Sequence, residues 1–287
     1  MPDHTVVTGP GVYSLPIDVY HADPVPGGSL SSTGARKLLP PSCPAQFKHW
    51  RDNPEPPSEV FDLGTAAHRL VLGVGPELVR VRFEEWRTNA VKAEVAEVRD
   101  RGAVPLRPSA YDTVHAMAEA LWAHPFAGRL FTPGTGLPEQ TLIWDANPPE
   151  VSCRALVDWL PNPTGGRLIL PDYKSCVSAA PDDVSKAVAR YGYHIQGAFY
   201  LAGLRALGLA DERARFVLVM QEKTPPYLVT VAEPDDEAMR LAAIRVEEAL
   251  LTYAECTATG RWPGYSDDVV PVALPPWETK ELREDTW

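Results

Sequence analysis

The segment formed by residues 153–175, CRALVDWLPNPTGGRLILPDYKS, most strongly limits how this chain can fold. Apolar residues alternate with polar ones on both sides of a turn rich in proline, asparagine and glycine, which predicts two strands, at 151–160 and 167–173. Successive side chains of a strand point to opposite faces, so Asp172 and Lys174 share a face. We predict a hairpin that brings Asp158, Asp172 and Lys174 together at one end of a sheet.

This arrangement of charges favours phosphodiester hydrolysis. Two neighbouring carboxylates repel each other unless a cation lies between them. Mg²⁺ suits oxygen ligands and phosphate substrates, and a lysine beside it can orient or deprotonate a water and stabilise developing charge. The alternative is a solvated end of a hairpin with an ordinary Asp–Lys ion pair, since D-x-K is a common tripeptide.

Two helical segments carry further candidate site residues. His68 lies in the apolar helix GTAAHRL, where it is either a core or surface histidine or a metal ligand. In YGYHIQGAFYLAG, Tyr193, Gln196 and Tyr200 share one helix face. Either they form the polar rim of an amphipathic helix, or Gln196 binds the attacking water or scissile phosphate while the tyrosines contact a DNA strand.

Glu139 is a further candidate carboxylate. It comes directly before the apolar strand QTLIW, from which it could reach the same site. A residue at the edge of a sheet is an equally good interpretation. Walker, G-x-S-x-G and dinucleotide-binding motifs are absent from the sequence.

The remaining pattern predicts an α/β domain with a mixed central sheet and flanking helices. We expect an extended arm through Gly28, short helices ending at Leu39 and Trp50, and helices over 89–101, 108–124, 182–207 and 234–259. Strands are expected at 77–83, 139–145, 215–221 and 227–232. We divide the chain into an N-terminal arm with short helices (1–57), a core (58–260) and a polar C-terminal tail (261–287).

Charge and cysteine usage exclude some classes of protein. The net charge of −11 argues against indiscriminate binding of phosphates, although residues 211–287 account for −8 of it and residues 1–210 for only −3. The four cysteines form no C-x-x-C pair, so we expect neither a zinc ribbon nor an iron–sulfur cluster. No apolar run is long enough for a membrane span and no secretory signal is recognisable, so we expect a cytoplasmic protein.

The order of these motifs resembles the RecB/RecE-like branch of PD-(D/E)xK nucleases. G-T-x-x-H is followed by a strand acid, by V-D, by D-Y-K-S and by Y-x-x-Q-x-x-x-Y, and the stretch YHADPVPGGSLSSTGARKLLPPSCPAQFKHW is similar to the opening of phage proteins of the exodeoxyribonuclease VIII type. This resemblance implies a restriction-endonuclease-like core with an N-terminal helical extension. It also implies metal ligation by His68, Asp158, Asp172 and the Tyr173 carbonyl, and catalytic roles for Lys174, Gln196, Tyr200, Asp158, Asp172 and Glu139.

The sequence departs from the family's pattern at two points. Pro171 precedes Asp172 where an apolar strand residue is more usual, and Cys153–Arg154–Ala155 replaces a run of basic, glycine and basic residues. The second departure puts a close approach of the backbone to DNA in doubt at that point.

The resemblance implies an exonuclease dependent on Mg²⁺ or Mn²⁺ that degrades one strand of linear double-stranded DNA from 5′ to 3′. The resemblance further implies that the protein acts in the host cytoplasm, works with a single-strand annealing protein and forms a ring-shaped homo-oligomer. We expect DNA contacts from Arg154, Lys186, Arg190 and Tyr193. An endonuclease of the same fold and a non-catalytic DNA-binding or assembly protein are the alternatives.

Overall fold

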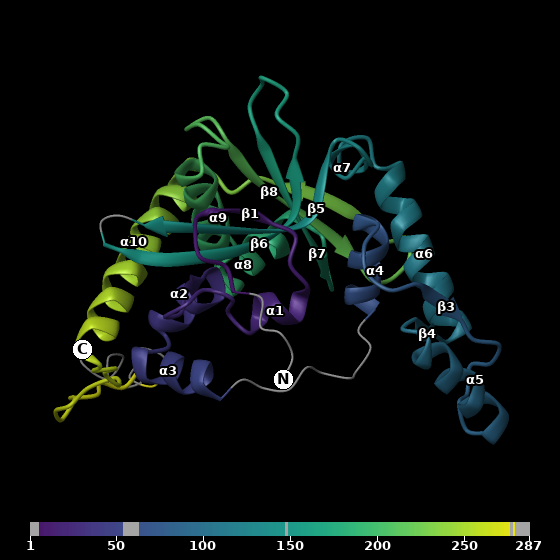
Figure 1. Ribbon diagram of the computed structural model, residues 1–287, viewed down its shortest axis with the longest axis horizontal. Helices are drawn as coiled ribbons and strands as arrows, with labels where there is room; N and C mark the ends of the chain where they lie inside the picture. The colour runs from purple at the N-terminus through teal and green to yellow at the C-terminus, as the bar shows by residue number, and fades with distance from the viewer. Residues whose placement is uncertain (1–5, 54–62, 147–148, 276–277, 279–287) are drawn as a thin grey trace, which may run out of the picture.

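The computed structural model describes residues 6–53, 63–146, 149–275 and 278. Two mixed sheets form its centre, and helices pack around them (Figure 1). The first sheet has the strand order β1 (Gly11–Tyr13), β5 (Gly136–Ala146), β6 (Val151–Pro161) and β2 (Leu30–Ser31). The second contains β7 (Ile169–Cys176), β8 (Arg215–Glu222) and β9 (Val229–Ala232). Each sheet combines parallel and antiparallel pairs, which confirms the predicted α/β class.

The predicted hairpin is wrong in its pairing. β6 pairs with β5 and β2, whereas β7 pairs with β8, so the two strands belong to different sheets. The strands still meet, because the Tyr173 N–H on β7 donates to Asp158 Oδ2 on β6 over 2.7 Å. A side-chain contact therefore joins the sheets where a backbone ladder was expected.

The expected extended arm at the N-terminus is also wrong. β1 pairs antiparallel with β5, and β2 pairs parallel with β6. β1 falls within the segment expected to be extended and β2 follows that segment closely, so both join the first sheet. Helix α1 (Ile17–His21) lies between these strands, and the Ser31 side chain caps α2 (Ser32–Leu38) by accepting from the Gly34 N–H. The N-terminal segment thus contributes directly to the first sheet.

Helices cover both sheets in a pattern close to the prediction. The remaining helices are α3 (Pro44–Asp52), α4 (Leu63–Leu72), α5 (Asn89–Asp100), α6 (Pro108–Ala123), α7 (Ala127–Leu130), α8 (Pro181–Tyr191), α9 (Tyr193–Ala206) and α10 (Asp236–Thr259). The single helix expected over 182–207 is interrupted at Gly192, which adopts the left-handed conformation with φ 65°. A Cβ there would lie 2.7 Å from Arg36 Cδ, so glycine serves both the turn and the close packing of α2.

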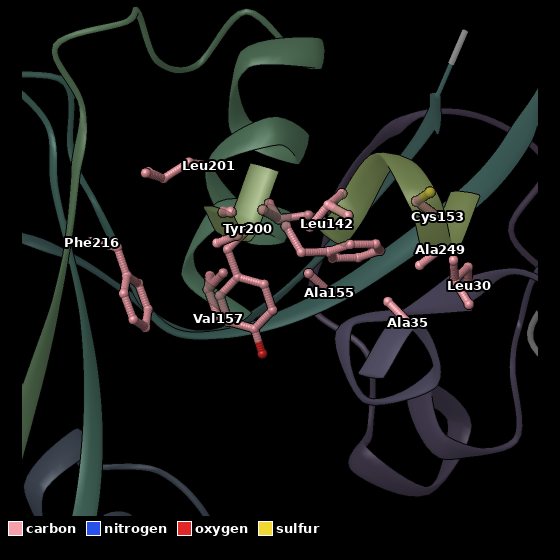
Figure 2. Close-up of a cluster of buried hydrophobic side chains, with 14 of the residues drawn as sticks. Leu30, Ala35, Leu142, Cys153, Ala155, Val157, Tyr200, Leu201, Phe216 and Ala249 are labelled. Carbon is pink, nitrogen blue, oxygen red and sulfur yellow. The ribbon is translucent and has the colours of Figure 1, made fainter. Parts of the chain in front are cut away.

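The main core lies where both sheets pack against α2, α9 and α10 (Figure 2). Its largest fully buried members include Leu30, Leu142, Phe199 and Phe216. Burying each side chain of this size stabilises the fold by about 1.5–3 kcal/mol. Tyr200 borders the cluster and points its hydroxyl away from it (Figure 2).

The segment between α4 and α6 projects from the sheets. It contains β3 (Leu78–Arg80), β4 (Val104–Leu106) and α5, which lie together at the lower right of Figure 1. Val81, Val91 and Val95 form a small core of its own. Among the described residues, no helix is both long and apolar enough to cross a membrane.

Candidate active site

The candidate site is built where β6 and β7 meet. Asp158 stands on β6, and one of its oxygens, Oδ2, accepts from the Tyr173 N–H. Its other oxygen, Oδ1, lies 3.1 Å from His68 Nε2 on α4. Both oxygens of this buried carboxylate are thereby held, so three elements fix its position.

Glu139 approaches the same group from β5. The register pairs Pro138 with Trp159 and Gln140 with Val157, which places Glu139 opposite Asp158. Glu139 adopts φ 47°, a left-handed conformation that is strained for a residue with a Cβ. Glu139 Oε1 lies 3.9 Å from His68 Nδ1, so the histidine is flanked by two carboxylates.

Asp172 on β7 is the most deeply buried acid of the site, with 1 % of its surface exposed. Its Oδ1 accepts from Gln196 Nε2 over 2.8 Å, and the same amide nitrogen donates to the Tyr200 hydroxyl over 3.1 Å. Oδ2 lies 2.5 Å from Lys174 Nζ, but without the alignment of a hydrogen bond. This oxygen is therefore held by the Lys174 ammonium alone, a contact that a metal ion could replace.

The two aspartates differ in their proton affinity. Burial raises the pKa of Asp172 to about 6, and the negative charge of Asp158 adds to this rise against the opposing effect of Lys174. Burial would also raise the pKa of Asp158, but His68, Lys174 and the Tyr173 N–H outweigh it and hold that pKa below its usual value. At neutral pH Asp158 is thus an anion stabilised by its partners.

The pKa values of the two cationic partners, His68 and Lys174, are both raised. Burial disfavours the charged forms of Lys174 and His68, yet the nearby carboxylates prevail and raise both pKa values. Asp172 and Asp158 act on Lys174, while Asp158 and Glu139 act on His68. Lys174 is therefore an ammonium ion at neutral pH, and it also lies 5.6 Å from the centre of the Tyr193 ring.

The donor set fits a hard divalent cation in kind. It offers carboxylate oxygens, one imidazole and a strand carbonyl, and Asp172 Oδ2 faces only the Lys174 ammonium. Within the described parts of the chain, no three His, Cys, Asp or Glu side chains already stand together as a metal cage. Instead, His68 and Lys174 now neutralise the two aspartates, and a cation would take over that task.

Three of the expected DNA-contacting residues lie elsewhere. Arg154 is buried and its Nη1 donates to Ser29 and lies 2.6 Å from Asp23 Oδ2, so it does not face a channel as expected. The N-terminal segment, through Asp23 and Ser29, covers the face of β6 from which Arg154 projects. Lys186 and Arg190 are exposed on α8, outside the cluster.

Tyr200 also differs from its expected role. It is only 6 % exposed and its hydroxyl accepts from Gln196, so it offers no open face on which a base could stack. Tyr193 remains half-buried beside Lys174 and keeps its predicted place at the rim.

Two residues near the site escape sequence reasoning. Gln221 on β8 is fully buried, accepts from the Tyr173 hydroxyl over 2.7 Å and donates to the Met117 carbonyl over 2.7 Å. It thus anchors the strand that carries Asp172 and Lys174 to α6. Arg36 on α2 donates to the Tyr191 carbonyl at the turn between α8 and α9. A polar residue in an apolar strand was the available signal for Gln221, and nothing in the local sequence marks Arg36.

The fold and the site together define a PD-(D/E)xK-like nuclease domain. The chain belongs to the family described as "PDDEXK-like domain of unknown function (DUF3799)", whose profile matches residues 31–271. No match is found among curated proteins. A crystal structure from Eubacterium rectale described as "Putative exonuclease" is similar in fold, with a TM-score of 0.57 and 12% identity over 93% of this chain and 98% of that chain.

Proposed function

We propose that this protein is a nuclease that hydrolyses DNA phosphodiester bonds with Mg²⁺ or Mn²⁺. One observation carries the proposal: two buried aspartates, a lysine and a glutamine from β6, β7 and α9 meet at one point. A purely structural ion pair needs neither the second acid nor the buried glutamine that binds Asp172. Burying such a set is costly, which favours a functional reason for keeping it.

The cation would be held by Asp158, Asp172, His68 and the Tyr173 carbonyl. When bound, it supplies positive charge to the scissile phosphate and makes a bound water more acidic. These ligands combine carboxylates with a single imidazole, a set that favours Mg²⁺ or Mn²⁺ over structural zinc. Glu139 contributes negative charge beside His68 and is the further candidate carboxylate.

Lys174 and Gln196 act on the reacting groups in this mechanism. Lys174 is protonated at neutral pH, so it stabilises negative charge that develops on the phosphate. The amide nitrogen of Gln196 already donates to Asp172 and Tyr200. Its carbonyl oxygen is then the group left to accept a hydrogen bond from the attacking water. Tyr200 holds the amide in that orientation.

We further propose that the enzyme is an exonuclease that degrades one strand of linear duplex DNA from 5′ to 3′. The resemblance of the motifs to the exodeoxyribonuclease VIII type supports this, as does the fold of the protein described as "Putative exonuclease". A net charge of −11 gives little long-range attraction to duplex DNA, so sustained digestion would need topological retention, such as a ring of subunits that loads at an end. The product of this digestion would be single-stranded DNA, and the enzyme's partner would be a single-strand annealing protein.

Digestion of one plasmid in supercoiled and singly cut forms tests this proposal. We expect shortening of the linear form with Mg²⁺ or Mn²⁺, survival of the closed circle, and binding without turnover in Ca²⁺. Duplexes labelled at one 5′ or 3′ end report polarity, and light scattering reports the oligomer. Nicking of closed circles at the rate of linear digestion would instead establish an endonuclease. Metal-dependent cleavage of neither form would identify a non-catalytic protein.

A further inference from the structure

The projecting segment formed by residues 78–107, here called the arm, differs in charge from the rest of the molecule. It contains seven lysines and arginines against five acids, a net charge of +2 in a chain whose total is −11. The arm comprises β3, α5 and β4 and stands away from both sheets (Figure 1). The arm is therefore a basic region of an acidic protein, and its effect on a partner depends on which of its charges are unpaired.

The acids of the arm are largely occupied by the fold. Glu84 accepts from the backbone N–H and hydroxyl of Ser109, at the start of α6. Glu94 accepts from the backbone N–H of Arg82, and Glu85 pairs with Arg87. These bonds engage three of the arm's five acids, while Glu97 and Asp100 are exposed on α5.

Most of its basic side chains have no such partner. Arg80 is engaged by Asp112 just beyond the arm. No carboxylate within the described parts of the chain forms an ion pair with the exposed side chains of Arg82, Lys92, Arg99, Arg101 and Arg107. Unpaired exposed arginines and lysines are the groups that bind phosphates.

Aromatic rings accompany two of these arginines. The Arg82 guanidinium lies 6.0 Å from the centre of the Phe83 ring, and that of Arg107 lies 5.7 Å from the centre of the Trp86 ring. Phe83 is 48 % exposed although it is apolar, whereas Trp86 packs against the small core of the arm. Arginines held beside aromatic rings are typical of surfaces that contact nucleic acid strands.

The arm is also close to the site along the chain. His68 stands on α4, whose last residue is Leu72, and the arm begins at Leu78. The path from His68 to the arm is at most roughly 26 Å if the helical part rises normally and the rest is fully extended. One turn of duplex DNA spans about 34 Å. A duplex whose end is at the site can therefore reach the arm within one turn.

We propose that the arm binds the phosphate backbone of the DNA substrate about one helical turn from the scissile bond, with Arg82 and Arg107 as its main contacts. This rests on the proposed nuclease function. The arm gives an acidic protein a local basic surface, so it retains substrate without a basic surface over the whole molecule.

The test is duplex binding measured by fluorescence anisotropy over a series of salt concentrations, in a Lys174→Ala background that prevents cleavage. For Arg82→Ala with Arg107→Ala, we expect Kd to rise about tenfold and the slope of log K against log salt to shrink by about 2, one unit for each lost phosphate contact. The matched control is Arg240→Ala with Arg245→Ala on α10, which removes the same charge from outside the arm; Arg240 is exposed, and Arg245 is partly exposed and paired with Glu248. It should leave the slope unchanged.

Other outcomes separate the two proposals. Equal losses in both double variants, or an unchanged slope in the arm variant, would overturn the arm's role while leaving the nuclease intact. A parent protein that neither binds nor cleaves duplex DNA would overturn both. If the arm variant changed the mass by light scattering, the arm would be a contact between subunits instead. The arm variant is also assayed with Lys174 intact on bis(p-nitrophenyl) phosphate, a substrate too small to reach the arm. It should hydrolyse this substrate at the wild-type rate.

Discussion

The junction of β6 and β7 and the arm of residues 78–107 hold charge in opposite ways. At the junction each charged side chain is largely buried and has a charged partner, as Asp158 has in His68 and Asp172 has in Lys174. In the arm the basic side chains are exposed and mostly unpaired. A buried set loses its function when one member is removed, since the remaining charge is left uncompensated. Exposed charges act through their sum and are screened by salt.

This contrast predicts different responses to mutation. Changes at the junction should alter chemistry or stability strongly and with little dependence on salt. Changes in the arm should alter affinity moderately, and less so as salt increases. The predictions that follow test whether the two regions are separated in this way.

The largest effect is expected from Asp172→Ala and from Lys174→Ala. Each removes a group that would hold the cation or stabilise the phosphate, so DNA cleavage should fall by at least about 10³-fold. The fold should survive, because neither side chain belongs to the apolar core, and circular dichroism with a thermal melt checks this. Asp183→Ala on α8 is the control, since that exposed acid pairs with nearby Lys186 and lies outside the cluster. A tenth of wild-type activity in either variant would remove that residue from the mechanism.

A large loss of stability without a loss of DNA binding is expected for Arg154→Ala. Arg154 is as basic as the arm residues but buried, and its removal leaves Asp23 without its cation. We expect the free energy of unfolding to fall by about 3 kcal/mol. In denaturant titrations this should appear as a lower midpoint, while the salt slope of duplex binding stays that of the parent. A reduced slope would show that Arg154 does contact DNA and would break the comparison.

Local sequence signals explain which parts of this structure could be predicted. The Ser31 cap, the strands around Asp158 and Asp172 and the final long helix all follow from residue patterns within a few positions. The catalytic set could be proposed for the same reason, since alternation along one strand places Asp172 and Lys174 on one face.

What the sequence could not predict depends on distant contacts. The pairing of β1 with β5 and of β2 with β6 joins segments far apart in the chain, so no local pattern marks them as strands. The interruption at Gly192 depends on Arg36 packing against that glycine, and the burial of Arg154 depends on Asp23 and Ser29. In each case a segment outside the local pattern decides the outcome.

A smaller effect is expected for Tyr173→Phe. This change removes the hydroxyl that donates to Gln221 and leaves the buried amide oxygen without a donor. Unfolding free energy should fall by about 2 kcal/mol. Tyr193→Phe is the matched control, because no hydrogen bond of its hydroxyl is found within the described residues, and it should change stability little. Equal stability of the two variants would show that Gln221 does not anchor the catalytic strand.

The smallest effect is expected in the pH dependence of stability, measured in EDTA. Because the pKa of Asp172 is raised to about 6, the folded protein binds more protons than the unfolded chain between about pH 4 and 6. Stability from this group is therefore fully present below the unfolded pKa and is lost as pH rises towards 6. As pH rises over that range, the unfolding free energy of wild type should fall relative to that of Asp172→Asn by about 1 kcal/mol per pH unit. The arm variant Arg82→Ala with Arg107→Ala should run parallel to wild type, because arginine does not titrate there. A difference from wild type that changes with pH in the arm variant, or one that does not change with pH in Asp172→Asn, would contradict the assignment of buried, titrating charge to the junction alone.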